Sequence, residues 1–194
     1  LCGIDTVGEA MNDATVSKYV RDFIFDEVNP TIDLPADQMT AFANSVIERY
    51  KNPYIRHELM SIALNSTTKF RTRLLPTLLD YVRLTGKLPA HLLFSFAALA
   101  VFHKGKRGDE DVALSDDPAF LAKWKKLWSE FDGDCAALAK KVLAWENAWG
   151  MDMNVPAREY ALACPRDRVA VLDNHIALFQ IFKRELMPLR NIFS

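Results

Sequence analysis

The feature that most constrains this chain is the recurrence of apolar residues at every third or fourth position. The pattern runs through most of the sequence, as at Val7, Met11 and Ala14, and it is typical of helices with one buried face. No segment alternates apolar and polar residues at every second position, as half-buried strands do. Only 7 of the 194 residues are glycine, too few for a fold of many tight turns. The sequence predicts an all-α fold of about eight helices with no sheet.

Capping residues and prolines mark the expected helix boundaries. Thr6 and Glu9 form a capping box at the start of a first long helix, which ends at Pro30. A second helix is expected over 36–50, and a third begins at Asn52-Pro53. The third helix is expected to turn inward Ile55, Leu59, Ile62 and Ala63. Further helices are expected over 76–84, 89–103, 118–131, 134–149 and 167–186, with a charged loop over 105–117.

The net charge of -1 conceals an uneven distribution of charge along the chain. Residues 1–45 include two basic and eight acidic residues, whereas residues 46–108, here called the basic segment, include 11 basic and three acidic ones. The basic segment either pairs with acidic neighbours in the fold or forms a site for a small anion. The acidic flanks argue against a nucleic-acid partner.

One cluster of cationic residues surrounds the expected helix start at Asn52-Pro53. Lys51, Arg56 and His57 lie within a few residues of it. The N-terminal end of a helix is partially positive, so cations there destabilise the helix slightly. The same positions are favourable when an anion binds the free N–H groups, and the cluster therefore predicts a small anion at this helix start.

A second cluster consists of Lys69, Arg71 and Arg73. In a helix Lys69 and Arg73 share one face, and in an extended segment all three residues do. Either arrangement can hold a carboxylate, which arginine binds with two parallel hydrogen bonds. From the residues alone, the cluster predicts a site for a small acid.

Several other classes of site have no support in the sequence. The four histidines show no metal-ligand spacing, and Gly-x-Gly, part of the dinucleotide fingerprint, is absent. The distant Cys2, Cys135 and Cys164 are typical of reduced thiols in a cytosolic protein. Residues 1–30 lack a secretory signal, and no apolar stretch is long enough to span a membrane. We therefore expect a cytoplasmic protein that binds no metal and contacts no membrane.

The aromatic residues have both a packing and a binding interpretation. The tryptophans form two pairs at i, i+4 spacing, namely Trp124 with Trp128 and Trp145 with Trp149. This stripe is expected to be the packing seam between two adjacent helices, or, where exposed, a surface for another domain. On the apolar helix expected over 89–103, His91 and His103 are expected to be core histidines, and His175 is expected on a helix surface.

Three segments carry a resemblance to a known family. They are GIDTVGEA over residues 3–10, ERYKNPYIRHEL over 48–59 and NSTTKFRTRLLP over 65–76. Together they resemble the C-terminal helical domain of the mannitol dehydrogenase family, the polyol-specific long-chain dehydrogenases. The pattern N-S-x-x-K-x-x-x-R-x-L-P is similar to that of the tagaturonate reductase, or altronate oxidoreductase, branch. The resemblance covers residues 1–105 well and assigns no role to residues 105–194.

The resemblance implies that residues 1–194 are the substrate-side helical domain of a larger enzyme. In the family an N-terminal Rossmann domain binds NAD, no metal takes part, and the acid/base lysine lies in a K-x-x-x-x-N-x-x-H motif. This chain lacks that motif, so no catalytic residue is expected in it. The chain would be a C-terminal fragment, inactive alone, of an NAD-dependent oxidoreductase that interconverts tagaturonate and altronate in hexuronate catabolism. Its start at Leu1 and its lack of a glycine-rich loop agree with a missing N-terminal domain.

Tagaturonate and altronate carry a carboxylate that mannitol lacks, so the resemblance implies cations at the substrate. The expected substrate-binding residues are Lys69, Arg73, Arg71, Arg56, His57 and Asn52. Two alternatives stay open. One is a related mannitol or fructuronate dehydrogenase domain, and the other is a stand-alone helical module that binds a partner protein through the tryptophan stripe.

Overall fold

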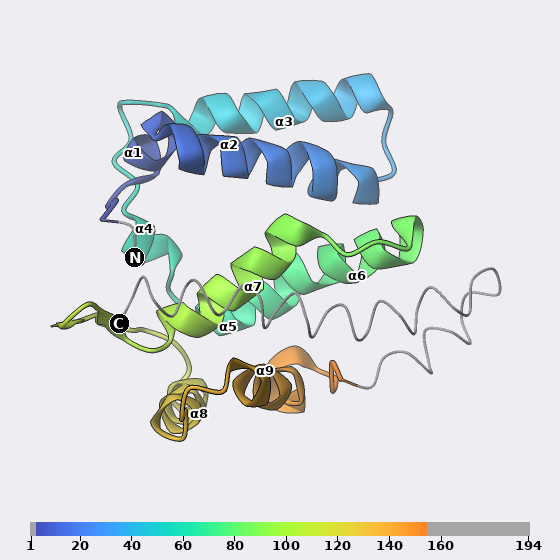
Figure 1. The fold of residues 1–194 in the computed structure, drawn as a ribbon. Helices are drawn as coiled ribbons and strands as arrows, with labels where there is room; N and C mark the ends of the chain where they lie inside the picture. The colour runs from blue at the N-terminus through green and yellow to red at the C-terminus, as the bar shows by residue number, and fades with distance from the viewer. Residues whose placement is uncertain (1–2, 155–194) are drawn as a thin grey trace. The chain divides into compact units, whose positions relative to one another are not determined.

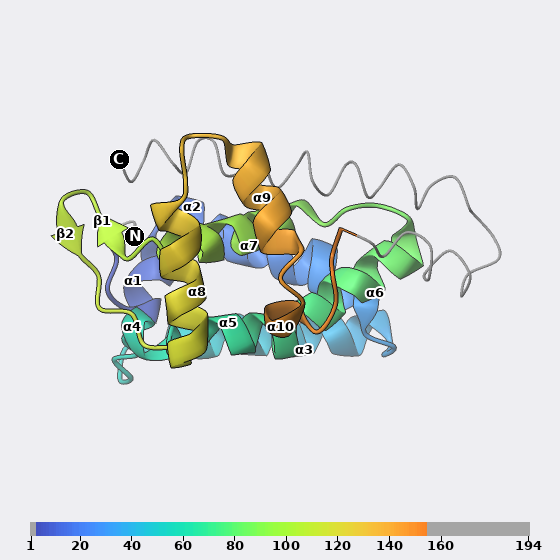
Figure 2. The same cartoon turned by 90° about the horizontal axis from the view of Figure 1, so that it is seen from below.

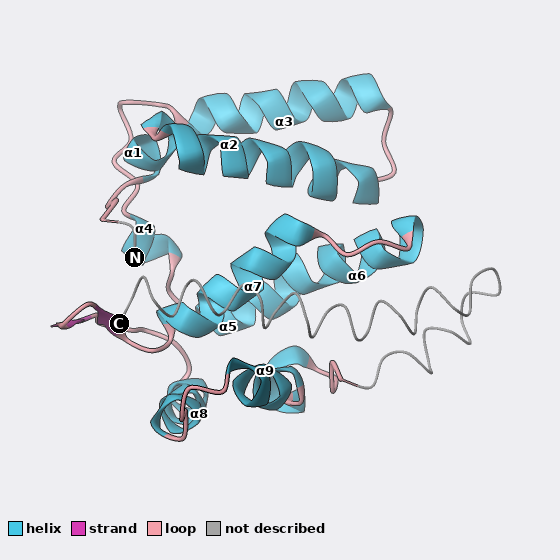
Figure 3. Cartoon of the chain, viewed as in Figure 1, coloured by secondary structure: helices cyan, strands magenta, loops and turns pink. Residues whose placement is uncertain are grey.

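The computed structural model describes residues 3–154 of the chain. The chain divides into two compact units, one ending at Leu64 and the other beginning at Asn65. In both units nearly all of the regular structure is helical (Figures 1 and 3). The predicted all-α fold class is confirmed.

The first unit is built on two antiparallel helices, later labelled α2 and α3, that lie side by side (Figure 1). Its elements are α1 (Val7–Asn12), α2 (Ala14–Asp22), the π-helical turn η1 (Phe23–Val28), the 3-10 turn η2 (Asn29–Thr31), α3 (Ala36–Tyr50) and α4 (Leu59–Ile62). Helix α3 occupies the range predicted for the second helix and turns Met39, Ala43 and Ile47 into the core. These residues are spaced by four positions, so they lie on one face of the helix.

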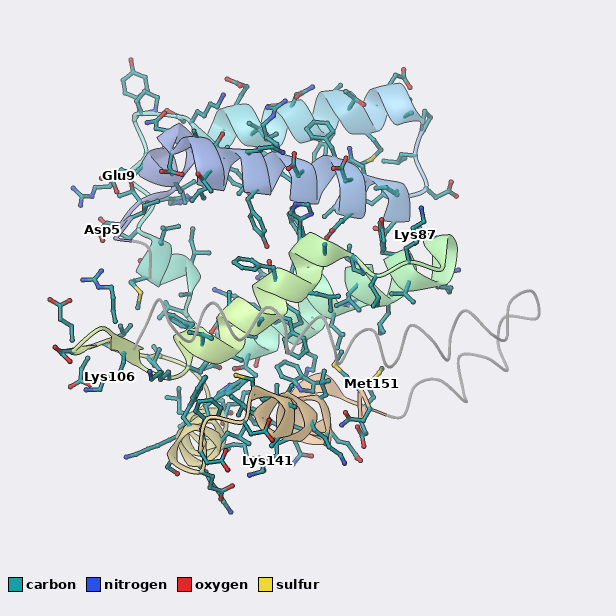
Figure 4. All side chains as sticks on the ribbon, in the orientation of Figure 1. Asp5, Glu9, Lys87, Lys106, Lys141 and Met151 are labelled. Carbon is teal, nitrogen blue, oxygen red and sulfur yellow. The ribbon has the colours of Figure 1, made fainter. Side chains whose placement is uncertain are left out.

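The capping box predicted at the start of α1 is present. The Thr6 hydroxyl accepts a hydrogen bond from the Glu9 N–H at 3.2 Å, and the Glu9 carboxylate accepts one from the Thr6 N–H at 3.0 Å. The same carboxylate accepts a second bond from the Asp5 N–H, and Asp5 and Glu9 lie together at this end of α1 (Figure 4). The bonds from the Asp5 and Thr6 N–H groups lower the pKa of Glu9, because they favour its charged form.

The single long first helix that the periodicity predicts is interrupted at Asp13. The Asp13 backbone is extended, and its carboxylate accepts hydrogen bonds from the N–H groups of Thr15 and Val16 at 2.9 and 2.8 Å. Asp13 therefore ends α1 and caps α2. The apolar pattern continues across the break, because a one-residue interruption hardly changes which face is buried.

The third predicted helix does not begin at Pro53. Residues 52–58 form a loop in which the Asn52 side chain accepts a hydrogen bond from the Tyr54 N–H at 3.0 Å, and α4 begins only at Leu59. The end of this loop is held extended, since the His57 carbonyl accepts a bond from the Val7 N–H at 2.9 Å. A backbone committed to that pairing cannot form helix.

This loop also corrects the predicted burial of the segment. Ile55 and Ile62 are 54% and 48% exposed, not turned inward as a helix from Pro53 would place them. Leu59 and Ala63 are half-buried. The three- and four-residue spacing remains in the sequence, but no helix converts it into a common face.

The second unit has a buried apolar helix and several helices packed around it. Its elements are α5 (Ser66–Lys69), the π-helical turn η3 (Phe70–Leu74), α6 (Leu75–Thr85), α7 (Ala90–Phe102), β1 (Lys106–Arg107), β2 (Glu110–Asp111), α8 (Pro118–Ser129), α9 (Cys135–Leu143) and α10 (Glu146–Trp149). Phe96 of α7 stacks on Phe70 at 4.7 Å and meets the edge of Trp149 at 4.9 Å between ring centroids. Such aromatic pairs add to the burial of apolar area in this core.

A continuous helical run extends from Ser66 to Thr85, although the sequence predicts a helix only from Pro76 onward. Proline has no N–H and crowds the carbonyl four residues before it, which belongs to Thr72. That carbonyl lies in η3, where the helix widens to i to i+5 bonding. The proline thus loosens the helix without ending it, and Gly86 ends it in the left-handed conformation.

The charged loop over 105–117 contains a small hairpin, which the prediction of no sheet missed (Figure 3). Strands β1 and β2 pair Lys106 with Asp111 and Arg107 with Glu110, and both pairs also form ion pairs, at 2.6 and 2.9 Å. Gly108 has a φ of 58°, which suits a tight hairpin turn. Lys106 marks this hairpin in Figure 4.

The tryptophan stripe is a packing seam. Trp124 of α8 meets Trp145 edge to face at 5.3 Å between centroids, and Trp145 meets Trp149 at 6.0 Å. All three side chains are buried. Helices α8 and α9 pack against each other (Figure 2). The helix predicted over 134–149 is divided into α9 and α10. The helix predicted over 167–186, with His175, lies outside the described residues.

Candidate functional site

The six residues predicted to bind substrate are divided between the two units. Asn52, Arg56 and His57 lie in the loop 52–58 of the first unit, and Lys69, Arg71 and Arg73 lie in the helical run of the second.

The predicted helix start at Asn52-Pro53 is wrong, since α4 begins only at Leu59, so the loop offers no helix N-terminus to an anion. Arg56 instead donates a hydrogen bond from Nε to the Glu58 carboxylate at 2.6 Å, and this bond and the charge of Glu58 raise the pKa of Arg56. His57 is exposed, and the Asn52 side chain closes a turn. The loop therefore offers an arginine whose charge is already balanced.

The second cluster takes the helical form that the sequence left open. Lys69 ends α5, and Arg71 and Arg73 lie in η3, so Lys69 and Arg73 share a face four residues apart. Arg71 donates from Nη1 to the Asn147 carbonyl in α10 at 3.4 Å. The Arg73 side chain is exposed and, within residues 3–154, makes no hydrogen bond or ion pair.

The two arginines of this cluster, Arg71 and Arg73, have no acidic partner in the described part of the chain. An unpaired guanidinium keeps its fork of donors, which matches the geometry of a carboxylate. The face of the helical run that carries Lys69 and Arg73 is therefore our candidate site for a small acid.

A second basic area, which sequence reasoning did not single out, lies between α8 and α9. It is a hollow of about 470 Å³ lined by Lys123, Lys126 and Lys141 around Trp145. Glu130 pairs with Lys141 at 3.1 Å and with Lys126 at 3.8 Å, and the bond from Lys141 lowers the pKa of Glu130. Lys141 is labelled in Figure 4. Because two of its three lysines already share the Glu130 carboxylate, this hollow is less suited to an anion than the Arg73 face.

A buried polar cluster lies at the start of the helical run. It consists of His103, Asp116, Thr67 and Trp124 and is here called the His103 cluster. The His103 ring is stacked on Trp124 at 4.9 Å, and its Nδ1 lies 2.9 Å from the Leu99 carbonyl. Its Nε2 lies 3.4 Å from both the Asp116 carboxylate and the Thr67 hydroxyl. The expectation that His103 is a core histidine is confirmed, and His91 is half-buried. Sequence reasoning missed Asp116, whose partners are distant in the chain.

The two ionisable groups of the His103 cluster have shifted pKa values. Burial lowers the pKa of His103, and the bond with the Leu99 carbonyl and the charge of Asp116 offset this only in part. Burial acts to raise the pKa of Asp116, but hydrogen bonds from the N–H groups of Thr67 and Asp117 outweigh it, so the pKa is lowered. A neutral imidazole therefore faces an ionised carboxylate at neutral pH.

The lowered pKa of His103 predicts a stability that falls on acidification. Below about pH 6.5 the unfolded chain binds more protons at this histidine than the folded chain, so the contribution is present above that pH and is lost below it. The slope from this one group is at most about 1.4 kcal/mol per pH unit. Denaturant titrations of the 194-residue chain between about pH 5 and pH 7.5 measure it.

In those titrations His103→Gln should show a weaker dependence of unfolding free energy on pH. His57→Gln, which removes an exposed histidine, is the matched control and should behave like the wild type. An equal pH dependence in wild type and His103→Gln would contradict the assignment.

Two further findings concern the described part of the chain. Residues 3–154 contain no group of three His, Cys, Asp or Glu side chains placed to bind a metal ion. Among the helices of those residues, none combines the length and the apolar character needed to cross a membrane.

The chain is similar to proteins of known activity over most of its length. It is 46% identical over 154 residues to altronate oxidoreductase of Enterobacter sp. (strain 638), and the match covers 78% of this chain and 32% of that protein. Altronate oxidoreductase of Yersinia pestis is 44% identical over 156 residues, 79% of this chain and 32% of the relative. The chain thus spans about a third of the length of these curated relatives.

A solved structure shows the same fold. It is the ternary complex of Pseudomonas fluorescens mannitol 2-dehydrogenase with NAD and D-mannitol, which is 20% identical and superposes with a TM-score of 0.74. The similarity covers 97% of this chain and 34% of that one. The family model of the mannitol dehydrogenase C-terminal domain matches residues 1–158. The chain belongs to the mannitol dehydrogenase C-terminal domain family.

Proposed function

We propose that this chain is the substrate-side part of an NAD-dependent oxidoreductase that interconverts altronate and tagaturonate. The observation that carries the proposal is the 46% identity to an altronate oxidoreductase over 154 residues. The relatives are about three times as long as the match, which supports an N-terminal domain as a partner in the same polypeptide. On this proposal the chain alone is inactive, since it lacks the lysine motif expected to move the hydroxyl proton.

The role proposed for this chain is to hold the carboxylate of the sugar acid. Lys69 and Arg73 present two cationic groups on one helix face, and Arg73 has no acidic partner among residues 3–154. Arg71, held to the Asn147 carbonyl, would add charge from the side. Fixing the carboxylate orients the distant hydroxyl carbon for reaction, which lowers the entropic part of the barrier.

Asn52, Arg56 and His57 have a lesser place in the proposal. They remain predicted substrate contacts. In their loop, however, the Asn52 side chain closes a turn, which supports a structural role, and the charge of Arg56 is already paired with that of Glu58. His57 is exposed and can offer a ring nitrogen.

The described residues do not fit the usual cradle for a dinucleotide. That cradle needs a strand, a glycine-rich turn and a helix N-terminus at the pyrophosphate, and residues 3–154 have only the two-residue strands of the β1–β2 hairpin. We therefore propose that NAD is bound by a domain outside these 194 residues, and that this chain contributes binding and orientation of the acid.

The proposal is tested by comparing substrates in the full-length enzyme. With NAD present, altronate should be oxidised with a much higher kcat/KM than mannitol, because only altronate offers a carboxylate to the cations. Production of NADH monitored by absorbance measures both reactions. Isothermal calorimetry of the 194-residue chain with NAD should show no binding.

Three outcomes would count against the proposal. A preference for mannitol would favour the alternative of a mannitol dehydrogenase domain and remove the role of the cations. In the reverse reaction with NADH, a higher kcat/KM for fructuronate than for tagaturonate would keep the carboxylate site but change the substrate. Clear binding of NAD by the 194-residue chain would contradict the assignment of the cofactor to another domain.

A further inference from the structure

The helical run that carries Lys69 and Arg73 begins without a local cap. Asn65, the residue before α5, has a left-handed backbone with φ 53° and ψ 40°, and its side chain makes no capping hydrogen bond. The first N–H groups of a helix have no partner within the helix, and leaving them buried and unpaired is costly. Something outside the run must satisfy them.

The missing cap comes from the end of the charged loop, far away in the sequence. The Asp116 carboxylate accepts a hydrogen bond from the Thr67 N–H at 2.8 Å, and the Ser115 carbonyl accepts one from the Asn65 N–H at 2.9 Å. Residues 49 positions apart are thereby joined at the first turn of the run. The Asp116 side chain is only 2% exposed, so water does not weaken this contact.

The rest of the His103 cluster fixes Asp116 and Thr67 in place. The Trp124 indole N–H donates to the Thr67 hydroxyl at 3.1 Å, and His103 lies against both the hydroxyl and the carboxylate. Asp116 also accepts a bond from the Asp117 N–H at 2.9 Å, next to the start of α8. The first turn of the run is thus tied to α7 and α8, the helices on either side of the charged loop.

The His103 cluster is not itself a reaction centre. Thr67 is 0% exposed and His103 is 3% exposed, so a substrate cannot reach the hydroxyl or the ring. Its effect must be transmitted through the backbone of the helical run. Lys69 follows Thr67 by two residues and Arg73 follows it by six, so the first turn decides where the Lys69 side chain lies relative to Arg73.

We propose that Asp116, held by His103, is a positioning residue. By capping the first turn of the helical run, it places the Lys69 side chain beside Arg73 on the face that binds the substrate carboxylate. The expected effect of Asp116 on substrate binding rests on the proposed function. The hydrogen bond by which Asp116 caps the helical run does not depend on that function. Without the Asp116 carboxylate, the first turn of the run frays and the two cations no longer form one binding face.

The test compares Asp116→Ala with Asp134→Ala in the full-length enzyme. Asp134 is the matched control because its carboxylate also caps a helix of the same unit, accepting bonds from the N–H groups of Ala136 and Ala137 in α9. Asp116→Ala should raise KM for altronate by about tenfold with KM for NAD unchanged, which corresponds to a cap worth about 1.4 kcal/mol. Asp134→Ala should leave KM for altronate unchanged.

A second measurement separates the cap from the proposed function. In the 194-residue chain, Asp116→Ala should speed amide hydrogen exchange over residues 66–69 by about tenfold, and Asp134→Ala should not. Asp116→Asn keeps a carbonyl acceptor and should restore part of both effects. If the wild-type enzyme does not oxidise altronate, the proposed function fails and the exchange data alone decide on the cap. Unchanged exchange, or equal effects of Asp116→Ala and Asp134→Ala on KM for altronate, would overturn the inference.

Discussion

Replacing Arg73 with alanine in the full-length enzyme is expected to lower kcat/KM for altronate by about 10- to 100-fold. A hydrogen bond to a charged group is worth about 1.5–3 kcal/mol, and the same energy taken from the transition state gives a loss of this size. The Arg73 side chain is exposed and has no partner among residues 3–154, so its removal should hardly change folding. Steady-state kinetics with altronate and NAD measure the effect.

The helical run offers a matched control for this variant. Arg83 lies on α6 of the same run, is also exposed, and pairs with the Asp80 carboxylate at 2.9 Å. Arg83→Ala should leave kcat/KM for altronate within about twofold, because an exposed ion pair contributes little. Arg73→Lys should recover part of the activity, since it keeps the charge and loses the two-pronged geometry. Equal kinetics in Arg73→Ala, Arg83→Ala and the wild type would remove Arg73 from the site.

Truncating Trp124 to alanine is expected to lower the free energy of unfolding of the 194-residue chain by about 3–5 kcal/mol. Trp124 is 0% exposed and contacts the rings of His103 and Trp145 at centroid distances of 4.9 and 5.3 Å. The change leaves a large cavity and removes the donor to the Thr67 hydroxyl. Since a domain of ordinary size is stable by only about 5–15 kcal/mol, the variant should lose a large part of its stability. Denaturant titration followed by circular dichroism measures the change.

A milder variant keeps this expectation testable when Trp124→Ala does not fold. Trp124→Phe retains an aromatic ring in the seam but cannot donate to Thr67, so it should cost less than the alanine variant. Tyr54→Ala removes an aromatic side chain that is 94% exposed and should change the unfolding free energy by no more than about 0.5 kcal/mol. A cost for Trp124→Ala no larger than that of Tyr54→Ala would show that the seam does not support the fold.

Much of the helical architecture could be predicted because its causes are local. The Thr6 and Glu9 capping box, the range of α3 and the stop at Gly86 all follow from residues within a turn or two of one another. Burial of the tryptophan seam could also be predicted, because i, i+4 spacing places two large rings on one face. The boundary predicted at Pro53 was wrong because pairing with the distant start of α1 prevailed over the local signal, and the one at Pro76 because the π-helical turn before it accommodates the proline.

The candidate site was predictable only in part. That Lys69 and Arg73 share a helix face follows from their spacing, once the segment is known to be helical. That Arg56 is paired and Arg73 is not depends on which acidic residues lie nearby in space, and no periodicity contains that information.

The sequence by itself determined most of the helical stretches, among them α3 and α7, and the charges they carry, because propensity, capping and periodicity act between neighbours in the chain. Only the tertiary structure decided that residues 57–58 pair with the start of α1 instead of forming a helix, and that Asp116 caps a helix 49 positions away. In both cases a backbone N–H group, that of Val7 or of Thr67, forms a hydrogen bond with an acceptor that is distant in the sequence. Such bonds form only after the chain has collapsed, when a buried N–H group must find whichever acceptor the packing brings to it.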